Sequence, residues 1–321
     1  HFGQSHSGPK QFLKTVALPF AQLRSSMFRL FLLALFLSKV DSEGDCSVKA
    51  KSLIQRKEIP VVDDDANILK FVSGCKFLFL DVGSNRGTHI RKLFEPHLYE
   101  TAPYLKIFDA MFGNASFRSQ PSSVTGLCGI GIEPNPRWAQ RFTQIEKAYQ
   151  TMGWKVKWLR KAVSNRTTNI TFWGDNAAET NDEGFSSSHR VDETHVWVPV
   201  QVQTLVFAEL LEKIHSIIPE SRTLIKMDIE GSEYEVLEQM LEKQLLCKTR
   251  IDTLTIEWHL DKLINKYKVK FDPETIQKYR DIEQRLGEGD SCSEGEPTKV
   301  IALDDESFIA DGRPLPGGWE R

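Results

Sequence analysis

Continuous apolar runs that end in an acidic residue recur along the chain. Because continuous hydrophobicity, rather than alternation, is typical of strands buried on both faces, these runs predict the centre of a parallel sheet. They cover residues 76–81, 128–133, 223–228 and 251–257, and they end at Asp81, Glu133, Asp228 and Glu257. Shorter or alternating runs predict further strands at residues 154–159, 169–173 and 196–202.

Segments of helical period separate these strands. Helices are predicted at residues 66–72, 88–94, 136–152, 205–217 and 232–246. Strands that alternate with such helices imply right-handed crossovers. The sequence therefore predicts an α/β fold with helices on both faces of a mostly parallel sheet.

Three segments show no regular period. Residues 95–126 are rich in Pro, Tyr, Phe, Ser and Gly, and we interpret them as an insertion that is able to cover the site. Residues 174–192 are mainly polar and predict a loop. The tail after Gly287 has the composition of a loosely ordered segment.

The first 45 residues differ from the rest of the chain, because no Asp or Glu precedes Asp41. The apolar run at 30–37 is far shorter than the ~20 residues that span a bilayer. With the basic Met27-Phe-Arg before it, this run is typical of a signal peptide, and residues 1–26 then represent upstream translation or an incomplete gene model. An organelle transit peptide, or a buried or disordered helix without a targeting role, is the alternative.

We therefore expect a secretory or extracellular protein, with organelle-targeted or cytoplasmic location as the alternatives. Membrane contact is expected only through the N-terminal segment, if it is uncleaved. Three N-x-S/T sequons, at Asn114, Asn165 and Asn169, are compatible with a secretory route.

Composition narrows the possible partners. The chain has 321 residues, of which 40% are hydrophobic, and a formal net charge of −3. This size suits one large domain with tails, and the charge provides no global basic field for nucleic acid. We therefore expect no nucleic-acid partner.

The five cysteines are far apart and form no CxxC pair. This odd, scattered set argues against a disulfide scaffold and against a structural zinc site. Cys75, Cys128 and Cys247 are interpreted as small buried apolar residues.

The acids at the strand ends carry the candidate chemistry. In an open parallel sheet, the ligand crevice lies beyond the carboxyl ends of the strands. Gly83 and Gly87, which follow Asp81, allow a sharp turn and a close approach of the backbone to a ligand, although the full G-x-G-x-x-G pattern is absent. Glu133, at the end of the next strand, is placed to bind both hydroxyls of a ribose, in NAD or in S-adenosylmethionine.

Five motifs resemble, in order, the blocks of the FkbM-type methyltransferases. They are Asp81-Val-Gly-Ser-Asn-Arg-Gly, Gly131-Ile-Glu-Pro-Asn-Pro, Lys161-Ala-Val-Ser, Lys226-Met-Asp-Ile-Glu-Gly-Ser-Glu-Tyr and Ile256-Glu-Trp-His. The resemblance covers residues 76–260. It implies a Rossmann-like class I methyltransferase fold with a seven-stranded, mostly parallel sheet whose last strand is reversed, and methyl transfer from S-adenosylmethionine, usually to a hydroxyl oxygen.

The resemblance also implies roles for individual residues. Asp81, Gly83, Asn85 and Gly87 would form the cofactor loop, with the first three around the methionine part of the cofactor. Glu133 would hold the ribose, and the backbone of Ala162 and Val163 would lie near the adenine. Lys226, Asp228, Glu230 and Glu233 match the signature block, with Glu257 and His259 at the end of the next strand. Of these, Glu230, Glu233 and Glu257 are the substrate-binding candidates.

Domain boundaries follow from these observations. We predict a targeting segment at 1–45, an N-terminal extension at 46–75, a methyltransferase domain at 76–265 with an insertion at 95–126, and a partly disordered C-terminal extension at 266–321. One departure from the family concerns Thr204-Leu-Val-Phe, where Val206 stands in place of a common Asp.

The mechanism expected from the cofactor is an in-line displacement at a sulfonium methyl, with acceptor and methyl held ~3–3.5 Å apart. A base assists an oxygen acceptor, and Asp228 and His259 are the candidates, although His259 is alternatively an ordinary histidine at the end of a strand. Lys226 is a third catalytic candidate or a partner of nearby carboxylates, and Glu230 and Glu233 are alternatively first-turn acids of the following helix. No metal is expected to be required, although the clustered carboxylates are able to bind a divalent ion.

The predicted function is therefore O-methylation of a hydroxyl on a glycan, lipid or secondary metabolite, with S-adenosylmethionine as the cofactor. A catalytically inactive Rossmann-like binding module and an NAD-dependent oxidoreductase are the alternatives. The acceptor is expected to be a small molecule, glycan or lipid.

Overall fold

The computed structural model describes residues 64–175, 185–186, 197–308 and 311–316. The chain divides into two units, His1–Glu58 and Ile59–Arg321, and all described residues belong to the second. The predicted targeting segment, most of the predicted N-terminal extension and most of the predicted loop at 174–192 lie outside the described residues.

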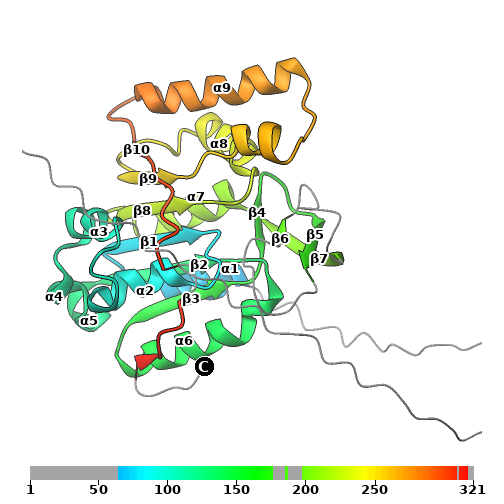
Figure 1. Ribbon diagram of the computed structural model, residues 1–321. Coiled ribbons are helices and arrows are strands. Elements are labelled where there is room, and N and C mark those ends of the chain that lie inside the picture. Colours follow the sequence, from blue (N-terminus) through cyan, green and yellow to red (C-terminus); the bar gives the residue numbers. More distant parts are fainter. Residues whose placement is uncertain (1–63, 176–184, 187–196, 309–310, 317–321) are drawn as a thin grey trace, which may run out of the picture. The chain divides into compact units, whose positions relative to one another are not determined.

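A parallel sheet forms the centre of this unit (Figure 1). Its strands occur in the order β10-β9-β8-β1-β2-β3, and every neighbouring pair is parallel. Their bounds are β1 Phe77–Val82, β2 Leu127–Ile132, β3 Lys155–Leu159, β8 Arg222–Met227, β9 Thr253–Ile256 and β10 Lys299–Ala302. The predicted α/β architecture is confirmed.

The edge of the sheet differs from the expectation. Within the described residues the sheet has six strands, and β10 runs parallel to β9 where a reversed seventh strand was expected. The long helix α9 (Pro273–Glu288) lies between these two strands in the chain. Such a crossover returns the chain to the starting edge of the sheet, which gives β10 the direction of β9.

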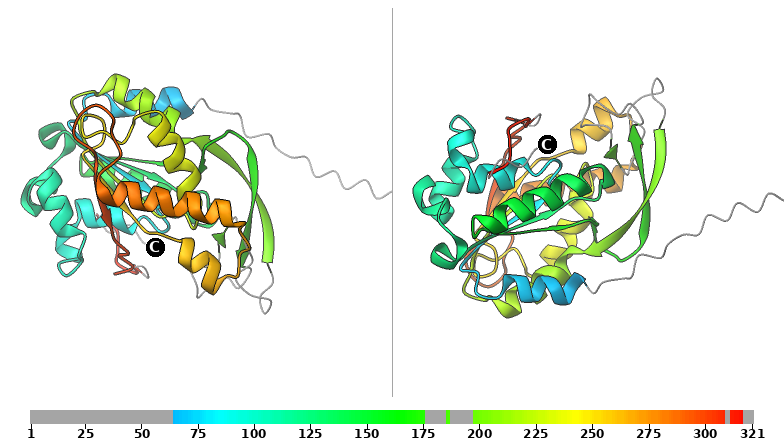
Figure 2. Two further views of the ribbon diagram at one scale, coloured as in Figure 1. Left: turned by 90° about the horizontal axis from the view of Figure 1, so that it is seen from above. Right: turned by 90° about the horizontal axis from the view of Figure 1, so that it is seen from below.

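Helices cover both faces of the sheet (Figures 1 and 2). Successive side chains of β1 point to opposite faces, so each face presents apolar side chains for helices to pack against. Leu78 and Leu80 pack into one apolar cluster with α1, α7, α8 and α9, whereas Phe79 packs into a second cluster with α2, α3 and α6. The bounds are α1 Asp64–Val72, α2 Thr88–Phe94, α3 Leu105–Phe112, α6 Ala139–Thr151, α7 Phe207–Ile217 and α8 Glu233–Glu242. Two short helices, η2 (Pro136–Trp138) and η3 (Lys262–Lys266), precede α6 and α9.

A second, smaller sheet carries the strands predicted at 169–173 and 196–202, together with two short strands that were not predicted, one of which lies in the predicted loop at 174–192. Its order is β4-β7-β5-β6, with bounds β4 Ala162–Ser164, β5 Asn169–Asp175, β6 Phe185–Ser186 and β7 Trp197–Val206. Val206 ends β7 and is the N-cap residue of α7, where its side chain makes no capping hydrogen bond. An Asp at this position can cap the helix, so the departure at Val206 removes a helix cap.

The aperiodic insertion is mostly helical. It contains η1 (Pro96–Leu98), α3, α4 (Ala115–Arg118) and α5 (Ser122–Thr125). The helical period of the insertion is hard to detect in the sequence because its helices are short. Phe108 and Phe112 of α3 are buried in an aromatic cluster with β1.

The segment after β10 crosses the ends of the strands toward α6 (Figure 1, red). Buried ion pairs hold it: Lys92 Nζ lies 2.9 Å from Asp305 Oδ2, and Arg91 Nη1 lies 2.6 Å from Asp311 Oδ2. Arg141 Nη2 also contacts Asp311, at 2.9 Å. The domain boundary predicted at 265 is not tested, but α9, β10 and this segment all pack on the sheet or its helices.

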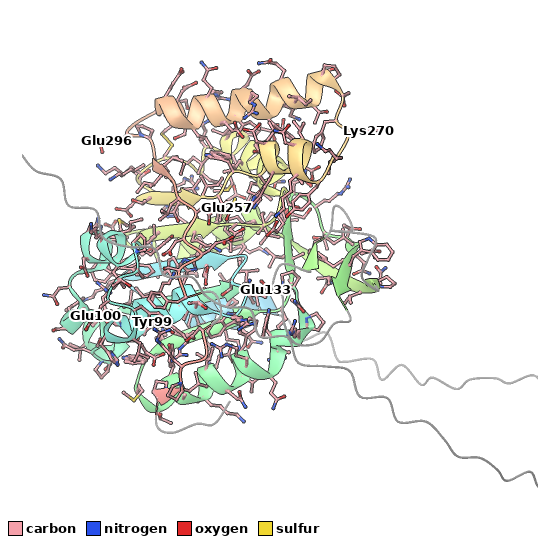
Figure 3. All side chains as sticks on the ribbon, in the orientation of Figure 1. Tyr99, Glu100, Glu133, Glu257, Lys270 and Glu296 are labelled. Atoms are coloured by element: carbon pink, nitrogen blue, oxygen red, sulfur yellow. A yellow bond between two sulfur atoms is a disulfide. The ribbon has the colours of Figure 1, made fainter. Side chains whose placement is uncertain are left out.

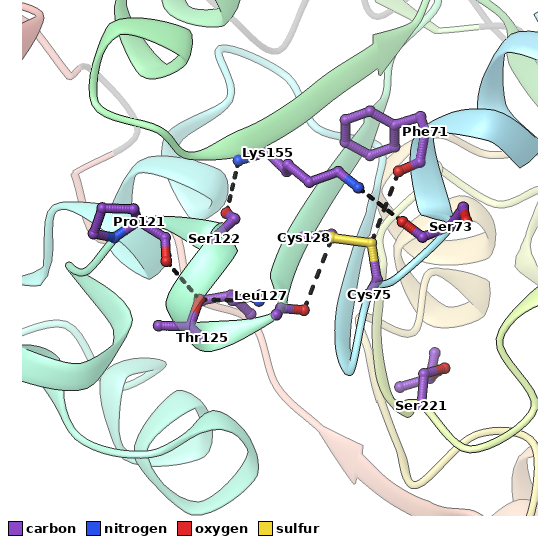
Figure 4. Close-up of a disulfide and its surroundings, with 12 residues drawn as sticks. Phe71, Ser73, Cys75, Pro121, Ser122, Thr125, Leu127, Cys128, Lys155 and Ser221 are labelled. Carbon is purple, nitrogen blue, oxygen red and sulfur yellow. Dashed lines mark hydrogen bonds between the residues drawn. A yellow bond between two sulfur atoms is a disulfide. The ribbon is translucent and has the colours of Figure 1, made fainter.

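Two disulfides correct the interpretation of the cysteines. Cys75 is bonded to Cys128 and Cys247 to Cys292, while Cys46 lies outside the described residues. Figure 4 shows the first bond, between the residue two before β1 and the second residue of β2. The prediction was wrong because it treated distance along the sequence as distance in space. The parallel pairing of β1 with β2 brings together cysteines separated by 53 positions.

Among the described residues, none of the helices has the length and apolar character that a bilayer span requires.

Candidate active site

The loop after β1 is in backbone contact with the loop after β8. Gly83 has φ 77°, and a Cβ at this position would lie 1.6 Å from the carbonyl oxygen of Asp228. The Asp228 N–H donates to the carbonyl of Val82 at 3.0 Å. Glycine is therefore required at 83 both for its conformation and for this close approach.

Gly87 and Gly131 make room for one indole ring. A Cβ on Gly87 would lie 2.8 Å from the Trp158 ring, and one on Gly131 would lie 2.1 Å from its Nε1. The indole stacks on Phe142 with ring centroids 4.8 Å apart, and its N–H donates to Ser84 Oγ at 3.1 Å. Trp158 thus packs against the glycine loop.

Glu133 stands at the end of β2, beside this loop. Its Oε2 accepts a hydrogen bond from the Asn85 N–H and its Oε1 one from the Asn135 N–H, both at 2.8 Å. Burial raises the pKa of Glu133 to about 7, although these two hydrogen bonds lower it. Each carboxylate oxygen keeps a further lone pair, so the ionised group can accept hydrogen bonds from two vicinal hydroxyls.

Lys226 links the two loops. Its Nζ donates to the Gly83 carbonyl at 2.7 Å and to Asp228 Oδ2 at 3.0 Å, and it lies 3.8 Å from Asp81 Oδ1. Burial lowers the pKa of Lys226, but the carboxylates of Asp228 and Asp81 outweigh burial and raise it above its usual value. Asp81 is fully buried, and its other oxygen accepts from Ser84 Oγ at 2.8 Å. Burial raises the pKa of Asp81.

A cavity opens at this edge of the sheet. Three parts of the chain line it: the β1–α2 segment with the insertion, the ends of β8 and β9, and the segment after β10. The lining residues are Gly83, Ser84, Asn85, Thr88, His89, Tyr104, Lys226, Asp228, Glu230, Glu257, Leu303, Asp304, Asp305, Glu306 and Ser307. Most of its charged groups are carboxylates, so the cavity is acidic.

His259 lies behind the wall formed by Asp228 and Glu257, and only 1% of its surface is exposed. Its Nδ1 lies 2.9 Å from Glu233 Oε1. The two Glu233 oxygens also accept from the N–H groups of Ile229 and Gly231, at 2.7 and 2.8 Å. Glu233 therefore fixes both the imidazole and the loop after β8.

Three further carboxylates surround the other side of the imidazole. His259 Nε2 lies 3.2 Å from Glu257 Oε1, 3.7 Å from Glu230 Oε2 and 3.8 Å from Asp228 Oδ1. Burial lowers the pKa of His259, but Glu233, Glu257 and Glu230 raise it to about 11. The pKa of Glu257 is lowered to about 2, because His259 and Lys262 outweigh its burial. Burial raises the pKa of Glu230 to about 7.

The comparison with known families agrees with this arrangement. A family model described as the methyltransferase FkbM domain matches residues 81–288, from the end of β1 to the end of α9. The chain belongs to the FkbM methyltransferase family. No curated protein and no solved structure matches the chain.

In this FkbM family member, most of the predicted site residues meet at one edge of the sheet. The loop residues Gly83 and Asn85 and the acids Asp228, Glu230 and Glu257 line the cavity together with Lys226. Glu133 joins them through its hydrogen bond to the Asn85 N–H. Glu133 and Glu257, labelled in Figure 3, directly follow β2 and β9, which lie on opposite sides of β1 in the sheet.

Other predicted residues lie behind the cavity. Asp81 and Glu233 are fully buried, so Glu233 has no surface for the predicted contact with a substrate and acts instead on His259 and the loop after β8. Ala162 and Val163 are buried on β4 in the smaller sheet. Gly87 opens α2 and packs against Trp158.

The sequence did not single out the residues that close the cavity. Tyr104 comes from the insertion and contacts Thr255 through its hydroxyl, and His89 comes from the first turn of α2. Burial lowers the pKa of His89, so it is neutral at pH 7. The acids at 304–306 come from beyond the region that the family model matches. Two of these residues had a signal in the sequence: His89 lies next to the glycine loop, and Tyr104 belongs to the insertion that was expected to cover the site.

Proposed function

We propose that this protein is an S-adenosylmethionine-dependent methyltransferase that methylates a hydroxyl on a glycan, lipid or secondary metabolite. The observation that carries the proposal is the position of Glu133. Its carboxylate is held by the N–H groups of Asn85 and Asn135, beside a glycine loop that opens directly into an acid-lined cavity.

The residues at this edge fit the cofactor. Glu133 would hold the ribose hydroxyls, and the buried Asn85 Oδ1 has no hydrogen-bond partner within the part of the chain that the structure describes. The carboxylates of the cavity suit the positive charges of an amino-acid ammonium and a sulfonium. When bound, the cofactor supplies an activated methyl group to a nucleophile.

Asp228 is the residue that would remove the proton of the acceptor hydroxyl. Its Oδ2 accepts from Lys226 and its side chain lines the cavity, so it is both fixed and accessible. Lys226 acts as a positioning residue, because it holds Asp228 and the Gly83 carbonyl at the same time. His259, buried behind Asp228, holds the neighbouring acids in place.

The segment after β10 would exclude water and select the acceptor. Asp305 is anchored to the buried Lys92 and places the 303–307 segment over the cavity. The acids of this segment disfavour a polyanion such as nucleic acid, because like charges repel. A neutral or cationic acceptor suits the cavity better.

We also propose that the chain matures in an oxidising compartment, as a secreted or secretory-pathway protein. Two disulfides support this location, since such bonds persist mainly outside the cytosol. Two of the sequon asparagines, Asn114 and Asn169, are exposed.

The test is incubation of the full chain with isotope-labelled S-adenosylmethionine and panels of glycans, lipid extracts and secondary metabolites. Mass spectrometry is expected to find a product that carries one labelled methyl group. Asp228→Asn should remove the product and retain cofactor binding. Reduction or oxidation of a substrate with NAD, without methylated product, would support an oxidoreductase, and absence of any cofactor binding would support an inactive binding module.

A further inference from the structure

The side of His259 that faces the cavity wall carries an unusual arrangement. Its Nε2 has no hydrogen-bond partner among the described residues, and its side chain is 1% exposed. Three carboxylate oxygens face this nitrogen, two of them at 3.7 and 3.8 Å. These two distances exceed the range of hydrogen bonds, whereas the third, 3.2 Å to Glu257 Oε1, is at the upper limit of that range.

The 3.2 Å distance between His259 Nε2 and Glu257 Oε1 matches the spacing of atoms that share a metal ion, and the 3.8 Å distance to Asp228 Oδ1 is a few tenths of an ångström longer. One ligand atom from each of Asp228, Glu257 and His259 lies within 4.8 Å of the others. An ion bound at ~2.1 Å separates adjacent ligands by roughly 3.0–3.4 Å. We propose that Asp228, Glu257 and His259 bind one divalent first-row metal ion, at the ends of β8 and β9.

The surroundings of the three ligands fit this assignment. Glu233 holds Nδ1 of His259, and in protein metal sites the second ring nitrogen of a ligating histidine is commonly fixed by a carboxylate in this way. Lys226 binds Oδ2 of Asp228, whereas Oδ1 is the oxygen directed toward His259. Asp228 and Glu257 both line the cavity, which gives an ion a path from solvent.

The charges of the cluster also favour a bound cation. Four carboxylates, those of Asp228, Glu230, Glu233 and Glu257, contact His259, and two lysines, Lys226 and Lys262, contact the carboxylates. The carboxylates outnumber the lysines, so the cluster has an excess of negative charge, which a divalent ion would reduce. A mixed nitrogen and oxygen ligand set suits ions such as Mn²⁺ or Zn²⁺.

The ion would have a defined role, which rests on the proposed function. An ion held by Asp228 at the cavity could also bind the acceptor hydroxyl and lower its pKa, so that the hydroxyl loses its proton more easily to a carboxylate of the cavity. Binding of the ion itself does not depend on methyl transfer.

The test uses Mn²⁺ as the probe and the full chain after treatment with a chelator, without S-adenosylmethionine. Electron paramagnetic resonance of free Mn²⁺ is expected to show one bound ion per chain. Glu257→Gln should weaken binding by at least about tenfold. The matched control is Glu306→Gln, which removes an exposed carboxylate from the same cavity and is expected to change the Kd less than about twofold.

A second measurement needs no variant. Spin-echo modulation of the bound Mn²⁺ should show coupling to a directly bound nitrogen, which in this cluster is Nε2 of His259. Any of three results overturns the proposal: no saturable binding, equal weakening by Glu257→Gln and Glu306→Gln, or a bound ion without nitrogen coupling. The carboxylates would then surround a protonated His259 without an ion.

Calorimetry with S-adenosylmethionine in the presence of chelator separates this proposal from the proposed function. Cofactor binding without any Mn²⁺ binding rejects only the metal site. Binding of Mn²⁺ with nitrogen coupling, but without cofactor binding, rejects only the methyltransferase.

Discussion

The two halves of the site are built in different ways. At the ends of β1 and β2, which we call the cofactor rim, backbone N–H groups hold Glu133 and a glycine carries the turn. At the ends of β8 and β9, the acceptor rim, the side chain of His259 is surrounded by the side chains of Glu233, Glu257 and Asp228. Residues 303–307 then close the cavity from a distant part of the chain.

This difference explains which half a sequence can predict. A rim built from backbone depends on a few consecutive residues, so a short motif is enough to define it. A rim built from side chains depends on packing between elements far apart in the chain. Lys226 connects the two, because it contacts Gly83 on one rim and Asp228 on the other.

The largest effect is expected for Gly83→Ala, which places a Cβ 1.6 Å from the Asp228 carbonyl oxygen. The two rims have to separate, so the free energy of unfolding should fall by more than about 4 kcal/mol. Gly74→Ala is the control, because Gly74 also has a positive φ (80°) but no atom within 4 Å of its Cβ position. Urea denaturation should show a loss of only about 1–2 kcal/mol for the control. Equal losses would mean that the rims are not in contact.

Next in size is Lys226→Met, which removes the link between the rims. Asp81 is fully buried and would lose its nearby cation, so a loss of about 4 kcal/mol is expected in denaturant unfolding. Lys262→Met provides the comparison: Lys262 is 33% exposed and pairs with Glu257 on the acceptor rim alone. Lys262→Met should lower the free energy of unfolding by about 1 kcal/mol or less. A small effect of Lys226→Met would show that Lys226 is not the link.

Removal of the Cys75–Cys128 disulfide should separate stability from binding. The bond closes a loop of 53 positions, for which chain entropy gives about 4 kcal/mol. It lies at the starting ends of β1 and β2, opposite the site, so the Cys75→Ala/Cys128→Ala variant should bind S-adenosylmethionine with unchanged affinity. Thermal unfolding and calorimetry of this variant test both statements. A loss of affinity would show that the disulfide at one end of the strands affects the site at the other end.

A smaller effect, about 3 kcal/mol, is expected from the ionisation of Glu133. Burial raises the pKa of Glu133 from 4.5 to about 7. Between these values the folded chain keeps a proton that the unfolded chain has lost, so the free energy of unfolding decreases as pH rises from 4.5 to 7. Above pH 7 this loss is complete.

Glu133→Gln removes this titration. As pH rises from 4.5 to 7, the free energy of unfolding of the wild type should therefore decrease relative to that of the variant. A difference that is constant between pH 4.5 and 7 would contradict the buried carboxyl at this position.

Much of the sheet follows from the sequence. The apolar runs predicted β1, β2, β8 and β9 within one or two residues, because strands buried on both faces contain few polar positions. The acids at the ends of these strands lie at one edge, as parallel strands require. The glycine loop was also predicted from the sequence. Position 83 requires glycine, because no other residue fits both its φ and its contact with Asp228.

The rest depends on contacts that no local pattern encodes. The pairing of Cys75 with Cys128 requires the register of β1 against β2. The contacts of Glu233 with His259 require the packing of α8 against the end of β9, and first-turn acids of a helix look the same whether they are buried or exposed. The closure by Asp305 requires its partner Lys92, which is 213 positions away.

Calorimetric titration of the full chain with S-adenosylmethionine at pH 8, where Glu133 is ionised, tests the central claim most directly. One saturable site is expected, with binding weakened by about 10- to 100-fold in Glu133→Gln, because the carboxylate no longer accepts from both ribose hydroxyls. Absence of binding, or equal affinity of wild type and Glu133→Gln, would contradict the assignment of the cofactor rim.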